Sequence, residues 1–217
     1  MLADRVLFLD GEALVIDKPA GLAVDPPRDG GISLDNHLDS LTLGFKRWPM
    51  AVHRLDRDTS GCLLLSRNPK AHARLQQAFE VNLVEKRYLA VLEGVPAESD
   101  GVVDLALAKM SSREAGWRMV GDLRGKTART AWRVLRTDGG RALVEFRPTT
   151  GRTHQIRVHA AAALGAAVVG DPIYGRADPQ GMLLHAADLV VPRAGKPPVA
   201  ATAPLPDRFV QAGFGHG

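Results

Sequence analysis

The chain has 217 residues, of which 45% are hydrophobic, and it carries a formal net charge of +4 at pH 7. A chain of this length can bury a substantial core and is expected to fold alone. It has no apolar run long enough to span a membrane, and its N-terminal stretch MLADRVLFLDGEALVIDK carries acids where a signal peptide needs a basic flank. We therefore expect a cytoplasmic protein without a membrane segment.

Cysteine usage and basic residues narrow the class further. The single cysteine, Cys62, excludes internal disulfides and multi-cysteine zinc sites. Basic residues recur in KMSSREAGWRMVGDLRGKTART and in GRTHQIRVH. A positive balance of this size is compatible with a polyanionic partner.

The first third of the chain predicts strands, a loop and a helix. RVLFLD and ALVID have strand patterns separated by a turn at Gly11, and the loop KPAGLAVDPPRDGG follows them. Ser33 can cap a helix in which Leu34, Leu38 and Leu41 fall at helical spacing. Gly44 is the expected end of that helix.

The middle of the chain predicts a buried strand, a helix and then a succession of strands. CLLLS is typical of a buried strand, and Asn68 followed by Pro69 indicates a helix start. Four strand-like runs come next: RYLAVLEG, GVVDLAL, RTAWRVLRT and RALVEFRP. Strands that outnumber helices and follow one another predict an α+β domain with a largely antiparallel or mixed sheet.

The last third predicts one helix and an extended tail. TGRTHQIRVHAAAALG has a helical pattern, with Thr153 as a possible N-cap and Gly165 as the C-terminal signal. From Pro192 onward, the glycine- and proline-rich sequence predicts an extension along the surface that is frayed after Phe209. No repeat or long linker divides the chain, so residues 1–217 are expected to form a single domain.

Charge is concentrated in the stretch AVHRLDRDTSG, directly before the strand CLLLS. A carboxylate next to a buried strand is costly unless it has a partner or a chemical role. Asp58 lies in the turn signal DTSG, where its side chain can accept backbone N–H groups two residues on. Asp56 has no such local role, so it is either tied to Arg54 or Arg57 or reactive.

Several chemistries are compatible with these residue types. A metal site would draw on His53, Asp56, Asp58, His154, His159 and His185. His154 and His159 are five residues apart, which on a helix places them about 140° around the axis, so the spacing argues against a zinc helix.

A hydrolase pair and a thiol nucleophile are two further alternatives. Asp56 and Asp58 on an extended segment would point the same way about 6.6 Å apart, close to what glycoside hydrolysis needs. The turn that involves Asp58 weakens that case. Cys62 opens a leucine run and is therefore typical of a small core residue.

The motif HRLDRDTSG resembles the signature of the RluA-type family of RNA pseudouridine synthases. LVIDKPAGLAV is similar to the family's first motif, KRYLAVLEG to its tyrosine motif, GRTHQIRVH with GDPIYG to its third, and LLHAADL with APLPDRF to its closing segment. These motifs cover nearly the whole chain in the family's order. The resemblance implies the pseudouridine synthase fold, a mixed and mostly antiparallel sheet with flanking helices and loops around a central active-site cleft.

The resemblance also implies the reaction. The enzyme would isomerise uridine to pseudouridine within rRNA or tRNA, without metal or cofactor, by breaking the bond from N1 to C1′ and joining C5 to C1′. The implied catalytic carboxylate is Asp56, acting as nucleophile at C1′ or as base at C2′. A nearby cation keeps such a carboxylate ionised by lowering its pKa. The third motif offers Arg157 first and Arg152 second.

The same resemblance implies how RNA is held. A uridine in folded RNA must be flipped out of its stack, and Tyr88 matches the aromatic residue on which the base stacks. Arg54 matches an arginine that enters the vacated space. The other expected substrate-binding residues are His53, Thr59, Arg152, His154 and Gln155. Basic residues in a hairpin-like region are candidates for phosphate contacts: Lys109, Arg113, Arg118, Lys126 and Arg129.

Two departures qualify the resemblance. Ala166 and Ala167 stand where the family often has His-Pro, a difference in a loop. Family members with an added RNA-binding domain carry it before the first motif, whereas here 12 residues precede ALVID. We therefore expect a catalytic-domain-only member that is a monomer and binds an RNA stem-loop. An N-glycoside hydrolase and a noncatalytic RNA-binding module remain the competing hypotheses.

Overall fold

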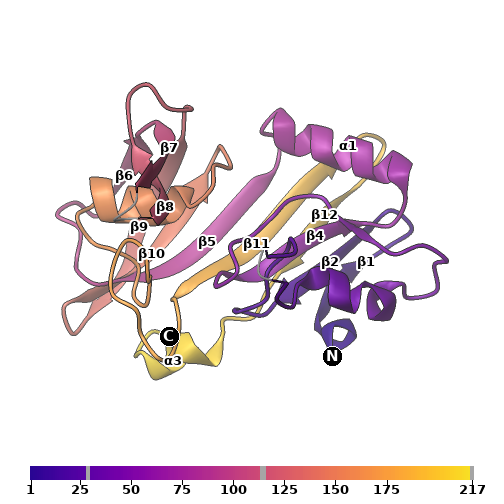
Figure 1. The fold of residues 1–217 in the computed structure, drawn as a ribbon, viewed down its shortest axis with the longest axis horizontal. Coiled ribbons are helices and arrows are strands. Elements are labelled where there is room, and N and C mark those ends of the chain that lie inside the picture. The colour runs from indigo at the N-terminus through magenta and orange to yellow at the C-terminus, as the bar shows by residue number, and fades with distance from the viewer. Residues whose placement is uncertain (28–29, 113–115, 216–217) are drawn as a thin grey trace. The chain divides into compact units, whose positions relative to one another are not determined.

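The computed structural model describes residues 1–27, 30–112 and 116–215. The chain forms two compact units (Figure 1). The first contains Met1–Lys86 and Ala186–Pro204, and the second contains Arg87–His185 and Leu205–Gly217. Within the described ranges, every helix is too short or too polar to cross a membrane.

The first unit is built on a sheet in the order β1-β2-β4-β11-β12. The strand pairs β1–β2, β2–β4, β3–β4 and β11–β12 are antiparallel. The strands are β1 (Val6–Leu9), β2 (Ala13–Lys18), β3 (Met50–Ala51), β4 (Ser60–Ser66), β11 (Leu184–Arg193) and β12 (Lys196–Thr202). Every residue of β2 and β4 is buried, which explains why CLLLS is apolar without alternation. The predictions of strands at RVLFLD, ALVID and CLLLS are confirmed.

Three short or medium helices complete the first unit: η1 (Leu2–Arg5), η2 (Leu34–Leu41) and α1 (Pro69–Glu80). Helix α1 packs on one face of the sheet through Ala71, Leu75 and Ala78 (Figure 1). Its start is confirmed, because the Asn68 side chain accepts a hydrogen bond of 2.9 Å from the Ala71 N–H. Helix η2 also begins after Ser33 as predicted, but as a 3₁₀-helix.

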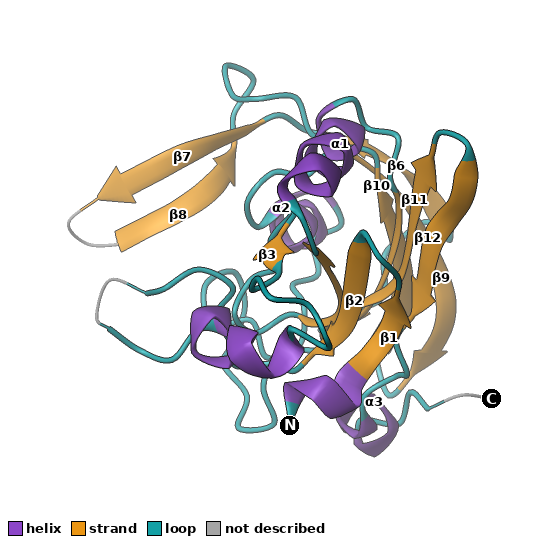
Figure 2. Cartoon of the chain, turned by 90° about the vertical axis from the view of Figure 1, so that its right-hand side faces the viewer, coloured by secondary structure: helices purple, strands orange, loops and turns teal. Residues whose placement is uncertain are grey.

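The second unit has an antiparallel sheet in the order β5-β10-β9-β6. Its strands are β5 (Glu85–Leu92), β6 (Asp100–Asp104), β9 (Arg129–Asp138) and β10 (Arg141–Pro148). Phe146, Trp132, Ile156 and Ala160 are core residues of this unit. A separate two-stranded ribbon, β7 (Leu107–Ser112) and β8 (Gly116–Gly121), extends from this unit (Figure 2). The run GVVDLAL is therefore divided between β6 and β7, and the hairpin-like region is confirmed.

The helix of the third motif is shorter than predicted and starts differently. It consists of α2 (Gln155–Val158) followed by the π-helical turn η3 (His159–Ala163). The N-cap is His154, with a φ of 54°, so the prediction of Thr153 was wrong. The Gln155 side chain supplies the physical reason, because its Oε1 accepts the Arg152 N–H at 2.9 Å and closes the preceding loop. Gly165, with a φ of 67°, follows the helix end as predicted.

The prediction of a frayed C-terminal extension was also wrong. Strand β12 pairs with β11, and its Val199 is fully buried. In the second unit, α3 (Asp207–Gln211) carries the buried Phe209, and Phe214 is 1% exposed. Apolar anchors at these positions outweigh the turn-rich composition, because buried aromatic rings each remove a large apolar area from water.

Candidate active site

The predicted site residues fall into two groups, one in each unit. His53, Arg54, Asp56 and Thr59 belong to the first unit. The second unit carries Tyr88, Arg152, His154, Gln155 and Arg157. Each group has its own local support, so the two are described separately.

Asp56 opens a tight turn before β4. Its carbonyl oxygen accepts the Thr59 N–H at 3.1 Å, and its side chain is half-buried. The chain therefore reverses at Arg57 and Asp58 instead of running straight. The extended segment assumed for the two-carboxylate hydrolase was wrong, so the spacing argument for that pair no longer holds.

The arginines beside Asp56 bind other carboxylates. Arg54 lies 2.7 Å from Asp25, and Arg57 lies 3.2 Å from Asp58. Both arginine side chains are about two-thirds exposed, at 66% and 67%. Exposed ion pairs contribute little to stability, so these arginines can exchange their partners at low cost.

A buried lysine that the sequence analysis did not single out holds the Asp56 turn. The Lys18 ammonium is fully buried and donates to the carbonyl oxygens of Pro19, Leu22 and Arg57 at 2.9, 2.7 and 2.9 Å. Its three N–H donors match three carbonyl acceptors. The Arg57 carbonyl also accepts the Gly21 N–H at 2.9 Å. The first motif thus fixes the backbone immediately after Asp56. In the sequence, the signal for this role was a lysine at the end of the apolar strand ALVID.

His53 bridges the charged stretch to β4. Its Nε2 accepts the Leu64 N–H at 3.0 Å, and its ring stacks on Phe79 with centroids 4.7 Å apart. Burial, and next the charge of Lys86, lower the pKa of His53 to about 3. The ring is therefore neutral at ordinary pH and acts as a hydrogen-bond acceptor inside the first unit.

Cys62 is a core residue of β4. Its thiol lies 3.5 Å from the carbonyl oxygens of Ala187 and Ala201. Burial raises the pKa of Cys62 to about 12, with the charge of Asp188 adding to the rise. The thiolate is the reactive form of cysteine, so this geometry favours a structural role, as the sequence pattern indicated.

In the second unit, Tyr88 lies on β5 directly opposite Phe146 of β10. Its ring is partly buried and packs against the core that contains Phe146 and Ile156. Facing residues on paired strands share one side of a sheet. Tyr88 therefore lies on the side of this sheet that α2 covers.

Arg157 has a carboxylate partner that the sequence analysis did not identify. Its Nε and Nη2 lie 2.7 and 2.8 Å from the two carboxylate oxygens of Asp171, and both residues are buried. Burial by itself would raise the pKa of Asp171, but the guanidinium and the N–H groups of Ile173 and Tyr174 outweigh burial and lower it. Asp171 belongs to the motif GDPIYG, so its place in a family motif was the sequence signal that could have identified it as a functional residue.

Gln155 connects the third-motif loop to β9. Its Oε1 accepts the Thr150 hydroxyl at 2.8 Å and the Arg152 N–H at 2.9 Å. Its Nε2 donates to the Arg129 carbonyl and the Thr130 hydroxyl at 3.1 and 2.9 Å. The buried amide thus has protein partners on both ends, and it orients the loop that carries the exposed Arg152.

His154 lies between two aromatic side chains. Its Nδ1 is 2.9 Å from the Tyr174 hydroxyl, and its ring meets the Trp117 ring edge-on at 5.3 Å. The Cζ of Arg157 lies 5.2 Å from the Tyr174 ring centroid. His154 and Arg157 therefore share Tyr174 as a neighbour.

The basic residues predicted in the hairpin-like region are accessible where the structure describes them. Lys109, Lys126 and Arg129 are exposed, and Arg118 is half-buried. Arg113 lies outside the described residues. Lys109 and Arg118 lie on β7 and β8, the ribbon shown in Figure 2.

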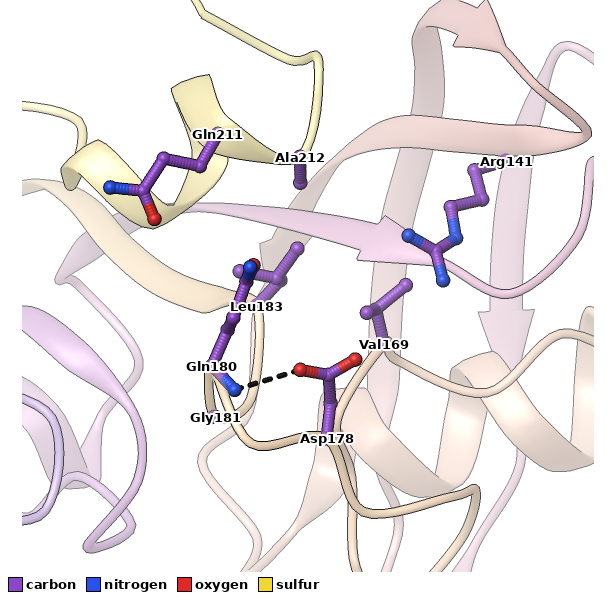
Figure 3. A pocket seen from close by; sticks show the side chains of 8 residues that line it. All are labelled: Arg141, Val169, Asp178, Gln180, Gly181, Leu183, Gln211 and Ala212. Atoms are coloured by element: carbon purple, nitrogen blue, oxygen red, sulfur yellow. Dashed lines mark hydrogen bonds between the residues drawn. The ribbon is translucent and has the colours of Figure 1, made fainter.

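A pocket of about 290 Å³ lies elsewhere in the second unit (Figure 3). Asp178 in its wall accepts the Gln180 N–H at 2.8 Å, and Arg141 pairs with Glu93 at 3.3 Å. The other lining residues are Val169, Gly181, Leu183, Gln211 and Ala212. None of the predicted site residues lines this pocket.

Residues 12–162 match the family model described as RNA pseudouridylate synthase. The match spans most of the chain and includes both groups of site residues. The chain therefore belongs to this family, in its RluA-type branch, and is an isomerase that acts on RNA. The predicted family, enzyme class and α+β pseudouridine synthase fold are confirmed.

Individual relatives agree with this assignment. The chain is 57% identical to an uncharacterized RNA pseudouridine synthase of Zymomonas mobilis subsp. mobilis, over 99% of both chains. It is 36% identical to ribosomal large subunit pseudouridine synthase D of the same organism, over 88% of this chain and 66% of the relative. Among solved structures, human RNA Pseudouridylate Synthase Domain Containing 4 aligns with a TM-score of 0.81 at 27% identity, covering 97% of this chain and 92% of that one.

Proposed function

We propose that this protein isomerises specific uridines of ribosomal RNA to pseudouridine, with Asp56 as the catalytic carboxylate. The observation that carries the proposal is the support of Asp56, which opens a turn whose next carbonyl is held by Lys18 and Gly21. A reactive group needs a rigid mount, because small displacements from the reacting atom lower the rate strongly. The ribosomal substrate is supported by relatives named as ribosomal large subunit synthases.

In the proposed reaction, Asp56 acts on the ribose as nucleophile at C1′ or as base at C2′. The bond between C1′ and N1 breaks, the base turns, and C5 forms the new bond to C1′. The hydrogen on C5 leaves to water and N1 gains a proton, so the overall reaction is an isomerisation. The proposed reaction consumes no oxidant and needs no metal or cofactor.

We propose Arg157 as a second catalytic residue of this reaction. The bidentate pair with Asp171 joins the Nε and Nη2 of Arg157 to the two carboxylate oxygens. Asp171 thus sets the orientation of the Arg157 guanidinium.

The remaining predicted site residues divide by burial. We propose that Tyr88 stacks on the flipped base and that the exposed Arg54 and Arg152 meet RNA. We also propose that His154 contacts the substrate, since it shares Tyr174 as a neighbour with Arg157. The packing of His53, Thr59 and Gln155 supports a different role for these three, which is to hold their loops. We further propose that residues 1–217 act as one cytoplasmic, monomeric catalytic domain that binds a stem-loop.

Tritium release from RNA labelled at C5 of uridine tests the proposal. The protein should release label, and Asp56→Asn should release none while retaining RNA affinity and folding. Asp58→Asn is the matched control, because Asp58 lies in the same turn and should affect stability more than turnover. Activity of Asp56→Asn would overturn the catalytic assignment. Free uracil as product would instead indicate a hydrolase, and RNA binding without either product would indicate a binding module.

The class of RNA can be tested separately. Pseudouridines in total RNA from cells with and without the gene should differ at positions in ribosomal RNA. Loss of a pseudouridine from tRNA alone would contradict the ribosomal substrate while leaving the reaction intact.

A further inference from the structure

The ribbon β7–β8 is anchored at its base to the rest of the second unit. A two-stranded hairpin alone is only marginally stable in water. Here the Met119 N–H donates to the Tyr174 hydroxyl at 3.0 Å, and Leu107 and Met119 pack with Ala128 and Val158. These contacts therefore fix the base of the ribbon on the second unit.

One face of the ribbon carries a tryptophan and a lysine. Ser111 pairs with Trp117 and Lys109 pairs with Met119, so Lys109, Trp117 and Met119 share one face. The Lys109 Nζ lies 5.8 Å from the centroid of the Trp117 ring. This is a cation–π arrangement. Trp117 itself is 41% exposed.

The Trp117 ring is linked to the third motif through two further rings. Trp117 meets His154 edge-on at 5.3 Å, and His154 meets Tyr174 edge-on at 5.6 Å. The Tyr174 ring lies 5.2 Å from the Cζ of Arg157. An aromatic row thus runs from the exposed ribbon to the arginine that we propose for catalysis.

His154 adds a second, independent sign of function in this row. Its φ of 54° is a conformation that a non-glycine side chain rarely adopts. Strained residues persist where their surroundings hold them, and they are frequent at ligand sites. The hydrogen bond between the Tyr174 hydroxyl and Nδ1, together with the edge-on contact with Trp117, holds His154 in this conformation.

We infer that Trp117 is a stacking platform for an unpaired base of the substrate RNA, next to the flipped uridine, with Lys109 beside it facing the backbone phosphate. The inference rests on the proposed function. An exposed indole with an adjacent cation is complementary to a base joined to a phosphate. Lys109 on this face and Arg118 on the opposite face give the ribbon positive charge, and the exposed Lys126 follows β8 in the chain.

Binding of transcribed ribosomal large-subunit RNA, measured in an Asp56→Asn background to prevent turnover, tests the inference. Trp117→Ala should weaken binding about 5- to 150-fold, the range expected for loss of one stacked base. Trp117→Phe should retain most of the affinity, whereas Trp117→Leu should lose it, because leucine preserves apolar packing without a π face. Trp48→Ala is the matched control, since Trp48 is 61% exposed in the first unit, and it should change affinity less than twofold.

A spectroscopic measurement separates stacking from a merely structural role. In a Trp48→Phe protein the remaining tryptophans are Trp117 and the buried Trp132, so RNA should quench the fluorescence of Trp117. Adding Trp117→Phe should abolish the quenching. Absence of quenching, or equal affinity of Trp117→Leu and Trp117→Phe, would overturn the inference.

The outcomes also distinguish this inference from the proposed function. With Asp56 present, Trp117→Ala should raise KM for RNA and leave kcat unchanged. Normal tritium release with unaltered KM would refute the platform and leave the synthase assignment intact. Absence of release by the unmodified protein, with weakened binding by Trp117→Ala, would refute the proposed reaction on this RNA and leave a stacking surface for it.

Discussion

At the scale of single residues, buried charges hold the two site groups in place. Lys18 and Asp171 have no exposed surface. Lys18 binds the carbonyl of the residue after Asp56, and Asp171 binds the side chain of Arg157. A buried charge is stable only while its partners are present. Their substitution therefore tests the support of the site separately from its chemistry.

Lys18→Met should destabilise the protein and misplace the Asp56 turn. The change leaves the carbonyls of Pro19, Leu22 and Arg57 without this donor, and each unsatisfied buried group costs about 1 to 3 kcal/mol. Urea unfolding should show a loss of at least about 2 kcal/mol, and tritium release should fall. The exposed Lys46→Met is the control and should be close to neutral. An unchanged unfolding midpoint for Lys18→Met would contradict this role.

Asp171→Asn should cost about 3 to 5 kcal/mol of unfolding free energy, because it leaves the Arg157 charge buried beside a neutral amide. Asp122→Asn, in the exposed pair with Arg124, should hardly change stability. Equal effects of the two substitutions in urea unfolding would show that the buried pair is not important for stability.

These residues illustrate what local sequence can predict. The Asn68 cap was predictable because donor and acceptor are three residues apart. The pairing of Arg157 with Asp171 and of Lys18 with the Arg57 carbonyl was not, because these partners lie 14 and 39 residues away along the chain. Sequence pattern records local geometry, whereas such pairs form only when distant segments fold together.

At the scale of elements, close approach of strands explains the DTSG glycine. Gly61 has a φ of 109°, and a Cβ at this position would lie 2.1 Å from the Ala186 carbonyl oxygen. The glycine therefore permits both the turn and the contact between β4 and β11. The sequence predicted the turn, but the contact depends on a strand more than a hundred residues later.

Gly61→Ala should destabilise the first unit by at least about 1 to 3 kcal/mol, the typical cost of one strained backbone conformation. Gly11→Ala is the control, since a Cβ there meets nothing within 4 Å. Thermal unfolding should separate the two variants clearly. Similar midpoints for both would contradict the close approach at Gly61.

Strand β12 was not predicted because its local sequence resembles a loop. Strand β12 contains Pro197 and Pro198, which remove backbone donors and resemble a loop signal. Pairing with β11 and burial of Val199 outweigh that local signal. Strands whose stability comes from a distant partner are the ones that local patterns predict poorly.

At the scale of the whole molecule, the free energy of unfolding should decrease as the pH falls, because His53 is held neutral in the folded protein. The folded protein holds this ring neutral with a pKa of about 3, against a usual value of 6.5. Between these values the unfolded chain binds a proton that the folded chain does not, so falling pH favours unfolding across this window. Below about pH 4, protonation of carboxylates with lowered pKa, including Asp10 and Asp171, adds a further loss.

His53→Gln should flatten the pH dependence between about pH 6.5 and pH 4. The amide oxygen can replace Nε2 as acceptor for the Leu64 N–H, and it does not titrate in this range. Urea unfolding at several pH values checks the slope, and both proteins should still lose stability below pH 4. Parallel curves for the two proteins down to pH 4 would contradict the role of His53.

The sequence by itself determined the family, the reaction class, most strands and the cap of α1. These features depend on neighbours along the chain or on ordered motifs that a sequence displays directly. The tertiary structure decided that Lys18 supports the Asp56 turn, that Asp171 orients Arg157, and that an aromatic row leads from Trp117 toward that arginine. Each of these depends on side chains that only folding brings within a few ångströms, where hydrogen bonds and charge pairs become strong.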